Sequence, residues 1–115
     1  MEKIEVRYKN KTLDIDVKRL RKWEMGIGLM FRTRKTKNLL FAFNKDKFIS
    51  LTACFVFFPF LVLWLDDENR VIEKRVIYPF ELRIFPKKSF RSIIEIPFSK
   101  KNKSILKFFD EDGKI

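Results

Sequence analysis

Apolar and polar residues alternate in two short segments at the start of the chain, residues 4–8 and 13–17. Asn10 and Lys11 lie between the two segments. A period of two residues is typical of a strand that buries one face, and a short polar break between two such runs is typical of a hairpin. The pattern therefore predicts an N-terminal β-hairpin.

The spacing becomes helical over residues 18–25, where Leu20 and Trp23 lie three positions apart and basic residues surround them. Residues three apart share one face of a helix, so both side chains can enter a core. Gly26 and Gly28 follow, and glycine commonly ends helices. We therefore predict a short helix near the N-terminus, with Trp23 as a core anchor.

From residue 38 onward the pattern is that of strands. We expect strands at residues 39–43, 48–51, 55–57, 60–65, 70–78, 92–96 and 105–109, with turns at 44–47, 66–69 and 99–104. Residues 60–65 contain no polar position, which predicts a strand buried on both faces. The predicted fold is mainly β, a small β-barrel or jelly-roll-like sandwich with one short helix near the N-terminus.

Length and composition indicate a single domain over residues 1–115, since 46% of the residues are hydrophobic and 14 are Phe. Cys54 is the single cysteine, so no internal disulfide can form and we expect a cytoplasmic location. Residues 48–65 carry no charge, as a membrane-spanning helix would. Pro59 and the many β-branched and aromatic residues favour strands there, so we expect no membrane span.

The sequence contains no histidine. This excludes serine–histidine and cysteine–histidine nucleophiles, and it removes the commonest zinc ligand. No glycine-rich phosphate loop is present either. We therefore expect no cofactor, no metal site and no catalytic residue of these classes.

Positive charge is concentrated toward the two ends of the chain. The formal net charge is +11, made up of +7 in residues 1–40, zero in residues 41–80 and +4 in residues 81–115. A candidate basic surface consists of Lys18, Arg19, Arg21, Lys22, Arg34 and Lys35. A further basic cluster consists of Lys100, Lys101 and Lys103. Such clusters can bind phosphate backbones or anionic lipid, but a solvated surface of a lysine-rich archaeal or bacterial protein is the interpretation that we favour.

Several motifs occur in an order that resembles the prokaryotic family called domain of unknown function 192. The first is the turn Gly28-Leu29-Met30-Phe31-Arg32 after the predicted helix. An apolar segment with the central Pro59 then leads into a strand and an acidic turn. Pro79 follows the return strand, and Glu95-Ile96-Pro97 comes later. The resemblance covers residues 12–110 and implies a compact, mainly β domain with no established reaction.

The chain also departs from the pattern of that family. Members usually have an aspartate two residues after the central proline, where this chain has Leu61. A histidine that is often found upstream of the proline is absent, with Thr52 or Ala53 in that region. If the family has a polar site there, this chain has lost part of it, which favours a binding or structural role over catalysis.

Gly28, Met30, Arg32 and Glu95 form the candidate cluster for a ligand or for a structural contact. The Arg32 guanidinium could clamp a carboxylate or a phosphate. The alternative is a structural salt bridge from Arg32 to Glu95 or Glu24, which we favour. We expect Met30 and Phe31 to belong to the core.

Three classes of function remain open. A small binding or interaction module without catalytic activity is the class that we favour, with a protein or a small ligand as its partner. A nucleic-acid-binding domain would use the basic N-terminal half, with Tyr8, Trp23 and Phe31 as stacking surfaces. An enzyme without histidine would use Arg32 and Glu95. One continuous basic face would support the nucleic-acid-binding class, and scattered lysines would argue against it.

Overall fold

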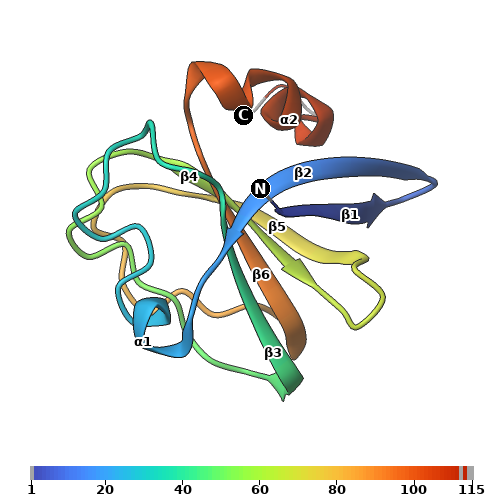
Figure 1. Ribbon diagram of the computed structural model, residues 1–115, viewed down its shortest axis with the longest axis horizontal. Helices are drawn as coiled ribbons and strands as arrows, with labels where there is room; N and C mark the ends of the chain where they lie inside the picture. The colour runs from blue at the N-terminus through green and yellow to red at the C-terminus, as the bar shows by residue number, and fades with distance from the viewer. Residues whose placement is uncertain (1, 112, 114–115) are drawn as a thin grey trace.

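The computed structural model describes residues 2–111 and 113, and its elements follow one another as six strands and two α-helices (Figure 1). The strands are β1 (Glu2–Tyr8), β2 (Lys11–Arg19), β3 (Leu39–Lys47), β4 (Phe60–Leu65), β5 (Val71–Ile77) and β6 (Phe90–Pro97). The helices are α1 (Lys22–Met25), a 3₁₀ turn (Lys100–Asn102) and α2 (Lys103–Phe109).

The strands form one sheet in the order β1-β2-β3-β6-β4-β5. All neighbours are antiparallel except β2 and β3, which are parallel over the short contact of Lys18 with Leu39 and Arg19 with Leu40. The sheet curls into a half-barrel, and the backbone N–H of Arg7 in β1 donates to Asn69 O before β5 at 2.9 Å. The mainly β prediction is confirmed, and the architecture is a single curled sheet.

Both predicted hairpins are present. β1 and β2 pair antiparallel from Glu2 with Val17 to Tyr8 with Lys11. Between β4 and β5, Asp66 organises the turn, because its Oδ1 accepts hydrogen bonds from the backbone N–H groups of Glu68 and Arg70, both at 2.9 Å. The polar breaks at residues 9–10 and 66–69 are therefore turns, and a carboxylate that bonds to nearby backbone N–H groups favours such a turn.

The sheet buries both of its faces. On one face, which we call the loop side, Phe41, Val62, Trp64 and Ile93 belong to one core. On the other, Leu40, Leu61 and Ile94 belong to a second core with residues of the β1–β2 hairpin and Phe109 of α2. Every residue of β4 is buried, as the absence of polar positions in residues 60–65 predicts.

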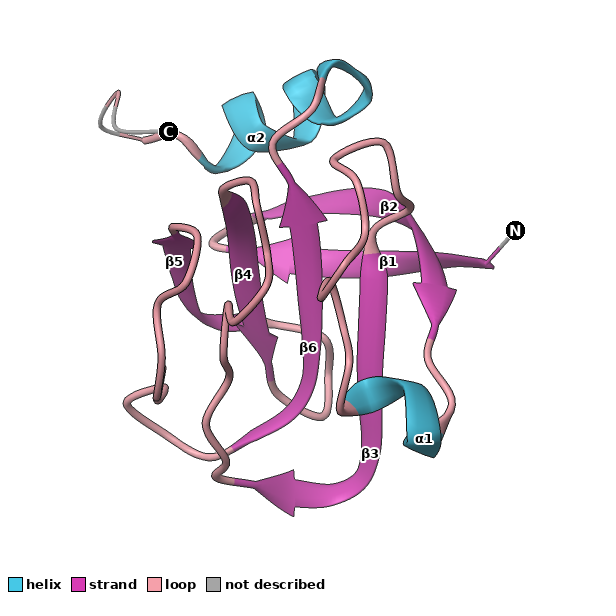
Figure 2. Cartoon of the chain, turned by 90° about the vertical axis from the view of Figure 1, so that its left-hand side faces the viewer, coloured by secondary structure: helices cyan, strands magenta, loops and turns pink. Residues whose placement is uncertain are grey.

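Three long connections cover the loop side of the sheet. They are residues 20–38 between β2 and β3, 48–59 between β3 and β4, and 78–89 between β5 and β6. Figure 2 shows these connections and α1 in front of β3, β6 and β4, with α2 at one end of the strands. The loop-side core is therefore closed by irregular chain.

The prediction placed the one short helix near the N-terminus, and this position is wrong. The longer helix, α2, lies at the C-terminus. Residues 105–109 were expected to form a strand. Their apolar side chains recur three and four positions apart, and Ile105, Phe108 and Phe109 pack in the second core, beside the β1–β2 hairpin. No helix among the described residues is long and apolar enough to cross a membrane.

The N-terminal helix is a single turn, shorter than residues 18–25. Lys18 and Arg19 extend β2 instead, because the N–H of Lys18 donates to Asn38 O at 2.8 Å and that of Leu20 to Leu40 O at 2.9 Å. Trp23 does not enter the core, since 70% of its surface is exposed. Its expected role as a core anchor is wrong.

Three predictions for residues 44–57 are also wrong. The expected turn at 44–47 is the end of β3, which continues to Lys47 through a bulge opposite β6. The expected strands at 48–51 and 55–57 are loop, and only Leu51 forms an isolated bridge, with Ile84. β-rich composition does not make a strand where no neighbouring strand offers hydrogen bonds.

Candidate functional site

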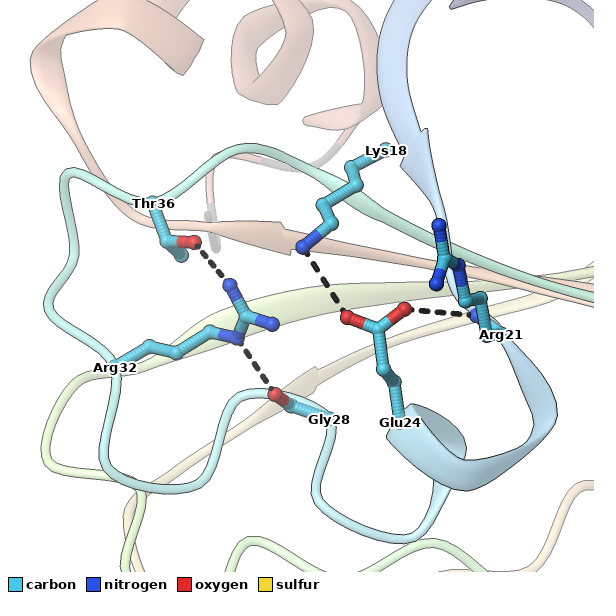
Figure 3. Close-up of polar contacts among 6 residues, drawn as sticks. All are labelled: Lys18, Arg21, Glu24, Gly28, Arg32 and Thr36. Carbon is cyan, nitrogen blue, oxygen red and sulfur yellow. Dashed lines mark hydrogen bonds and ion pairs between the residues drawn. The ribbon is translucent and has the colours of Figure 1, made fainter.

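The turn at Gly28–Arg32 is built on the single turn of α1. Glu24 Oε1 accepts a hydrogen bond from the backbone N–H of Arg21 at 3.0 Å, and its Oε2 pairs with Lys18 Nζ at 3.2 Å (Figure 3). The bond from Arg21, with the contact to Lys18, lowers the pKa of Glu24. The N–H of Gly28 then donates to Glu24 O at 3.0 Å, which closes the turn.

Arg32 folds back over this turn. Its Nε donates to Gly28 O at 2.9 Å, and its Nη1 lies 3.4 Å from Thr36 Oγ1 (Figure 3). Among the ion pairs of the described residues, Arg32 pairs with neither Glu95 nor Glu24. The guanidinium therefore holds the backbone of the turn, and the expected salt bridge is absent.

Glu95 lies in β6 opposite Leu39 of β3 and Val62 of β4, in the middle of the sheet. Its side chain is only 3% exposed, and its Oε1 has no hydrogen-bond partner among the described residues. Burial raises the pKa of Glu95 to about 8, because an apolar environment disfavours the carboxylate. At neutral pH the side chain is mainly a neutral carboxylic acid.

The structure brings together only part of the candidate cluster. Gly28 approaches Glu95 closely, so that a Cβ at Gly28 would lie 3.3 Å from Glu95 Oε1. Met30 is half-buried, and Arg32 bonds to the turn rather than to Glu95. Phe31 does not belong to the core, since 69% of its surface is exposed. The buried carboxyl group of Glu95 therefore lies beside Gly28, where a side chain would crowd it, which the order of motifs could not reveal.

Large apolar side chains are exposed on the three connections. We call this set the loop face. Among the described residues its members are Trp23, Ile27, Phe31, Phe48, Ile49, Phe55, Phe57, Tyr78, Phe80, Leu82 and Phe85. The strands and α2 contribute none of them, so this exposure is confined to the three connections.

Four phenylalanines form the centre of the loop face. Phe31 stacks on Phe55 with ring centroids 4.9 Å apart, and Phe80 meets Phe55 and Phe57 edge-on at 6.1 and 5.2 Å. The three connections are joined below these rings, because Phe31 N–H donates to Phe55 O and Phe80 N–H to Ala53 O, both at 3.0 Å. The aromatic cluster therefore belongs to a tied assembly of loops.

A groove of about 1140 Å³ lies beside α2, where the connection of residues 20–38 approaches the C-terminal segment. We call it the basic groove. It is lined by Arg34, Lys35, Phe98, Ser99, Lys100, Lys101, Lys103, Leu106, Lys107 and Asp110. Lys101 Nζ donates to Lys35 O at 3.0 Å and ties its two walls together. Of these lining residues six are basic and one is acidic, so the groove is strongly positive.

The six residues of the candidate basic surface do not form one site. Lys18 pairs with Glu24, and Arg19 pairs with Glu2 at 2.7 Å. Arg21 and Lys22 are exposed at α1, and only Arg34 and Lys35 line the basic groove. The remaining cations of the groove come from the C-terminal segment. That cluster is visible in the sequence, but its position beside Arg34 depends on α2, whose residues 105–109 were predicted as a strand after a turn at 99–104.

Other candidate chemistry is sparse. In the part of the chain that the structure describes, no three His, Cys, Asp or Glu residues gather as metal ligands would. Tyr8, a predicted stacking surface, packs against Phe109 with ring centroids 5.2 Å apart and is half-buried. Of the three predicted stacking residues, Trp23 and Phe31 remain accessible.

No family model and no curated protein matches the sequence. Two solved structures are similar in fold. The first is described as a "putative transcription regulator" from Sinorhizobium meliloti 1021, with a TM-score of 0.70 and 15% identity over 88% of this chain and 81% of that one. The second, a protein of unknown function from Novosphingobium aromaticivorans DSM 12444, has a TM-score of 0.68 and 16% identity over 90% and 76% of the chains. At this level of identity the likeness shows that the chain shares their fold.

Proposed function

We propose that the protein is a small binding module without catalytic chemistry and that its basic groove takes a polyanion, the phosphate backbone of a nucleic acid. One observation carries the proposal. The fold places Arg34 and Lys35 opposite Lys100, Lys101, Lys103 and Lys107, although more than half of the sequence separates the two groups. Neutralising phosphates with lysine and arginine supplies most of the affinity of non-specific nucleic-acid binding.

The lining of the groove supports an extended anionic ligand. Phe98 and Leu106 are apolar, so a ligand with sugars or bases as well as phosphates would contact both kinds of surface. The description of the Sinorhizobium protein of similar fold as a transcription regulator agrees with such a ligand. The sequence alone favours a solvated surface over a nucleic-acid-binding one, whereas the grouping of six cations in one groove favours nucleic-acid binding.

The alternative of an enzyme that uses Arg32 and Glu95 has less support. Arg32 is engaged by Gly28 O and Thr36, and Glu95 is buried in the middle of the sheet, opposite Leu39 and Val62. A reacting group needs access to its substrate, and neither the position of Arg32 nor that of Glu95 provides it.

We also propose that the protein belongs to the family called domain of unknown function 192. A cytoplasmic location is part of the same proposal, and the free thiol of Cys54 agrees with it.

An anisotropy titration with labelled single-stranded and duplex oligonucleotides, repeated at several salt concentrations, tests the proposal. The groove variant carries Lys100→Ala, Lys103→Ala and Lys107→Ala, which are exposed positions. A matched control carries Lys11→Ala, Lys45→Ala and Lys88→Ala, also exposed and outside the groove. Both variants lose the same formal charge, so they separate a local site from a general attraction.

We expect the groove variant to lose at least about tenfold in affinity and the slope of log affinity against log salt to fall by about 2 to 3 for duplex DNA. The control should stay within about twofold of the parent. Equal losses in the two variants would mean that net charge alone attracts the oligonucleotide. That outcome, or the absence of binding at physiological salt, would refute the proposal.

A further inference from the structure

The loop face combines features that the basic groove does not explain. We propose that it binds the surface of an anionic lipid bilayer, with its aromatic side chains entering the boundary between headgroups and acyl chains. This inference concerns a different surface from the groove and goes beyond nucleic-acid binding.

The apolar part of the face is unusual for a protein surface. Phe57 is 60% exposed, and with Phe31, Phe55 and Phe80 it forms one continuous aromatic cluster. Single exposed apolar residues are common, but a contiguous rimmed patch marks a site of interaction with a protein or a membrane. Aromatic rings are also the side chains that favour the interface between membrane and water.

The backbone holds these rings outward. Phe31, Phe55 and Phe80 adopt positive φ values of 61°, 56° and 65°. Bulky residues rarely adopt this conformation, and strained residues persist where the surrounding structure fixes them. Here two backbone hydrogen bonds hold the conformation. The N–H of Phe31 donates to Phe55 O, and the N–H of Phe80 donates to Ala53 O. Phe55 contacts both Phe31 and Phe80, so three strained, exposed phenylalanines lie together, which supports a surface that binds a partner.

The connections that flank the apolar centre carry net positive charge. The connection of residues 48–59 carries no charge, whereas residues 20–38 and 78–89, without the groove residues Arg34 and Lys35, carry seven basic and two acidic residues. In the sequence, Lys22 is next to Trp23 and Arg83 is next to Leu82. The two carboxylates are engaged, since Glu24 pairs with Lys18 and Glu81 accepts a hydrogen bond from the N–H of Tyr78. The flanking segments therefore present net positive charge beside the aromatic cluster.

This combination favours a bilayer over the other occupants. A second copy would bring the same positive segments into contact and would be repelled. A nucleic acid would match the cations and the rings but would leave Ile27, Ile49 and Leu82 against polar backbone. An anionic bilayer supplies phosphate groups for the cations and hydrocarbon for the apolar tips, and the two attractions add.

Flotation of the full chain with vesicles tests the inference. The vesicles contain either phosphatidylcholine alone or equimolar phosphatidylcholine and phosphatidylglycerol. Trp23 is a built-in reporter, because it lies on the loop face, whereas Trp64 is fully buried. We expect binding to the anionic vesicles at least about tenfold tighter than to the neutral ones, a decrease with salt, and a blue shift of the Trp23 emission on binding.

Two variants examine the two attractions separately. The first carries Phe31→Asn, Phe57→Ser and Phe80→Asn, since asparagine tolerates positive φ and all three positions are exposed. The second carries Lys22→Ala and Arg83→Ala and leaves the aromatic cluster intact. Each should lose at least about fivefold in affinity for anionic vesicles, as loss of apolar or charged membrane contacts requires. The groove variant should bind vesicles like the parent.

Several results would overturn the inference. These are no flotation with either vesicle, equal binding to both vesicles, or full binding by both loop-face variants. Concentration-dependent self-association without lipid that the Phe variant abolishes would assign the face to a second copy instead. Loss of oligonucleotide binding in the Phe variant, without flotation of the parent, would assign it to nucleic acid. If vesicles bind but oligonucleotides do not, the proposed function of the groove fails and this inference stands.

Discussion

Glu95 Oε1 lies 3.3 Å from the position that a Cβ would take at Gly28, although the two residues are 67 positions apart in the sequence. The φ of Gly28 is +53°, and its missing side chain leaves room for the buried carboxyl group. This close approach joins the turn before Arg32 to the central strand β6. A residue with a Cβ at this position would meet both a strained backbone and an occupied space.

The first prediction is that Gly28→Ala destabilises the fold by about 1–3 kcal/mol. The new Cβ would lie 3.2 Å from Phe41 Cζ and 3.3 Å from Glu95 Oε1. Urea unfolding measures the change. Gly26→Ala is the matched control, because Gly26 has a φ of −69° and a Cβ added there would meet no atom within 4 Å. Equal stability of the two variants would contradict the role assigned to Gly28.

The second prediction concerns the pH dependence of stability. The pKa of Glu95 is raised from 4.5 to about 8 in the folded state. The folded protein therefore binds more protons than the unfolded chain between these values, and its stability falls as the pH rises through that window. The expected slope from this group is about −1.4 kcal/mol per pH unit, and it flattens above the folded pKa.

Glu95→Gln removes this contribution, because an amide does not titrate. Unfolding free energies of parent and variant, measured at several pH values, should diverge as the pH rises and favour the variant by up to about 3 kcal/mol near neutrality. Groups that titrate in both proteins cancel in the difference. A difference that does not change with pH would mean that Glu95 is ionised in the fold.

The third prediction is that Arg32 stabilises the turn. Arg32→Ala removes the bond from Nε to Gly28 O at 2.9 Å and should cost about 1 kcal/mol in urea unfolding. Arg34→Ala is the control, since Arg34 is exposed and lies only two positions away. Unchanged stability together with lost oligonucleotide or vesicle binding would show that Arg32 contacts a ligand.

The fourth prediction concerns β4. Val62 is fully buried between β5 and β6, so Val62→Asp should prevent folding, because an unpaired buried charge costs several kcal/mol, about the stability of a small domain. Circular dichroism and the dispersion of amide NMR signals measure the loss. Thr12→Asp, at an exposed position of β2, should fold normally. A cooperatively folded Val62→Asp protein would contradict the assignment of β4 as a central strand.

The elements that the sequence predicts best are those with a local signal. Residues 60–65 are β4 with the same bounds, and the turn at Asp66 is visible as an acidic, asparagine-containing break. Residues 105–109 lacked such a signal. A short apolar run fits a strand or a helix, and packing of Phe109 on the hairpin decides between them.

The surface features depended on contacts between distant segments. Trp23 and Phe31 were expected to be buried because large apolar residues usually are, and the structure exposes both. The basic groove joins Arg34 to Lys107 across most of the chain, which no local pattern can predict. The sequence did single out Gly28 and Glu95, but as members of one cluster with Arg32, which the turn holds elsewhere.

The place of β6 in the sheet has a consequence for how the chain folds during synthesis. β6 separates β3 from β4, yet it comes after both in the sequence. A ribosome must therefore release residues 90–97 before β3 can be linked to the β4–β5 hairpin, and until then the apolar residues of these strands lack their partner. Because the pairings of β3 and of β4 with β6 both wait for the last quarter of the chain, we expect the domain to fold cooperatively after translation, and slowly for its size.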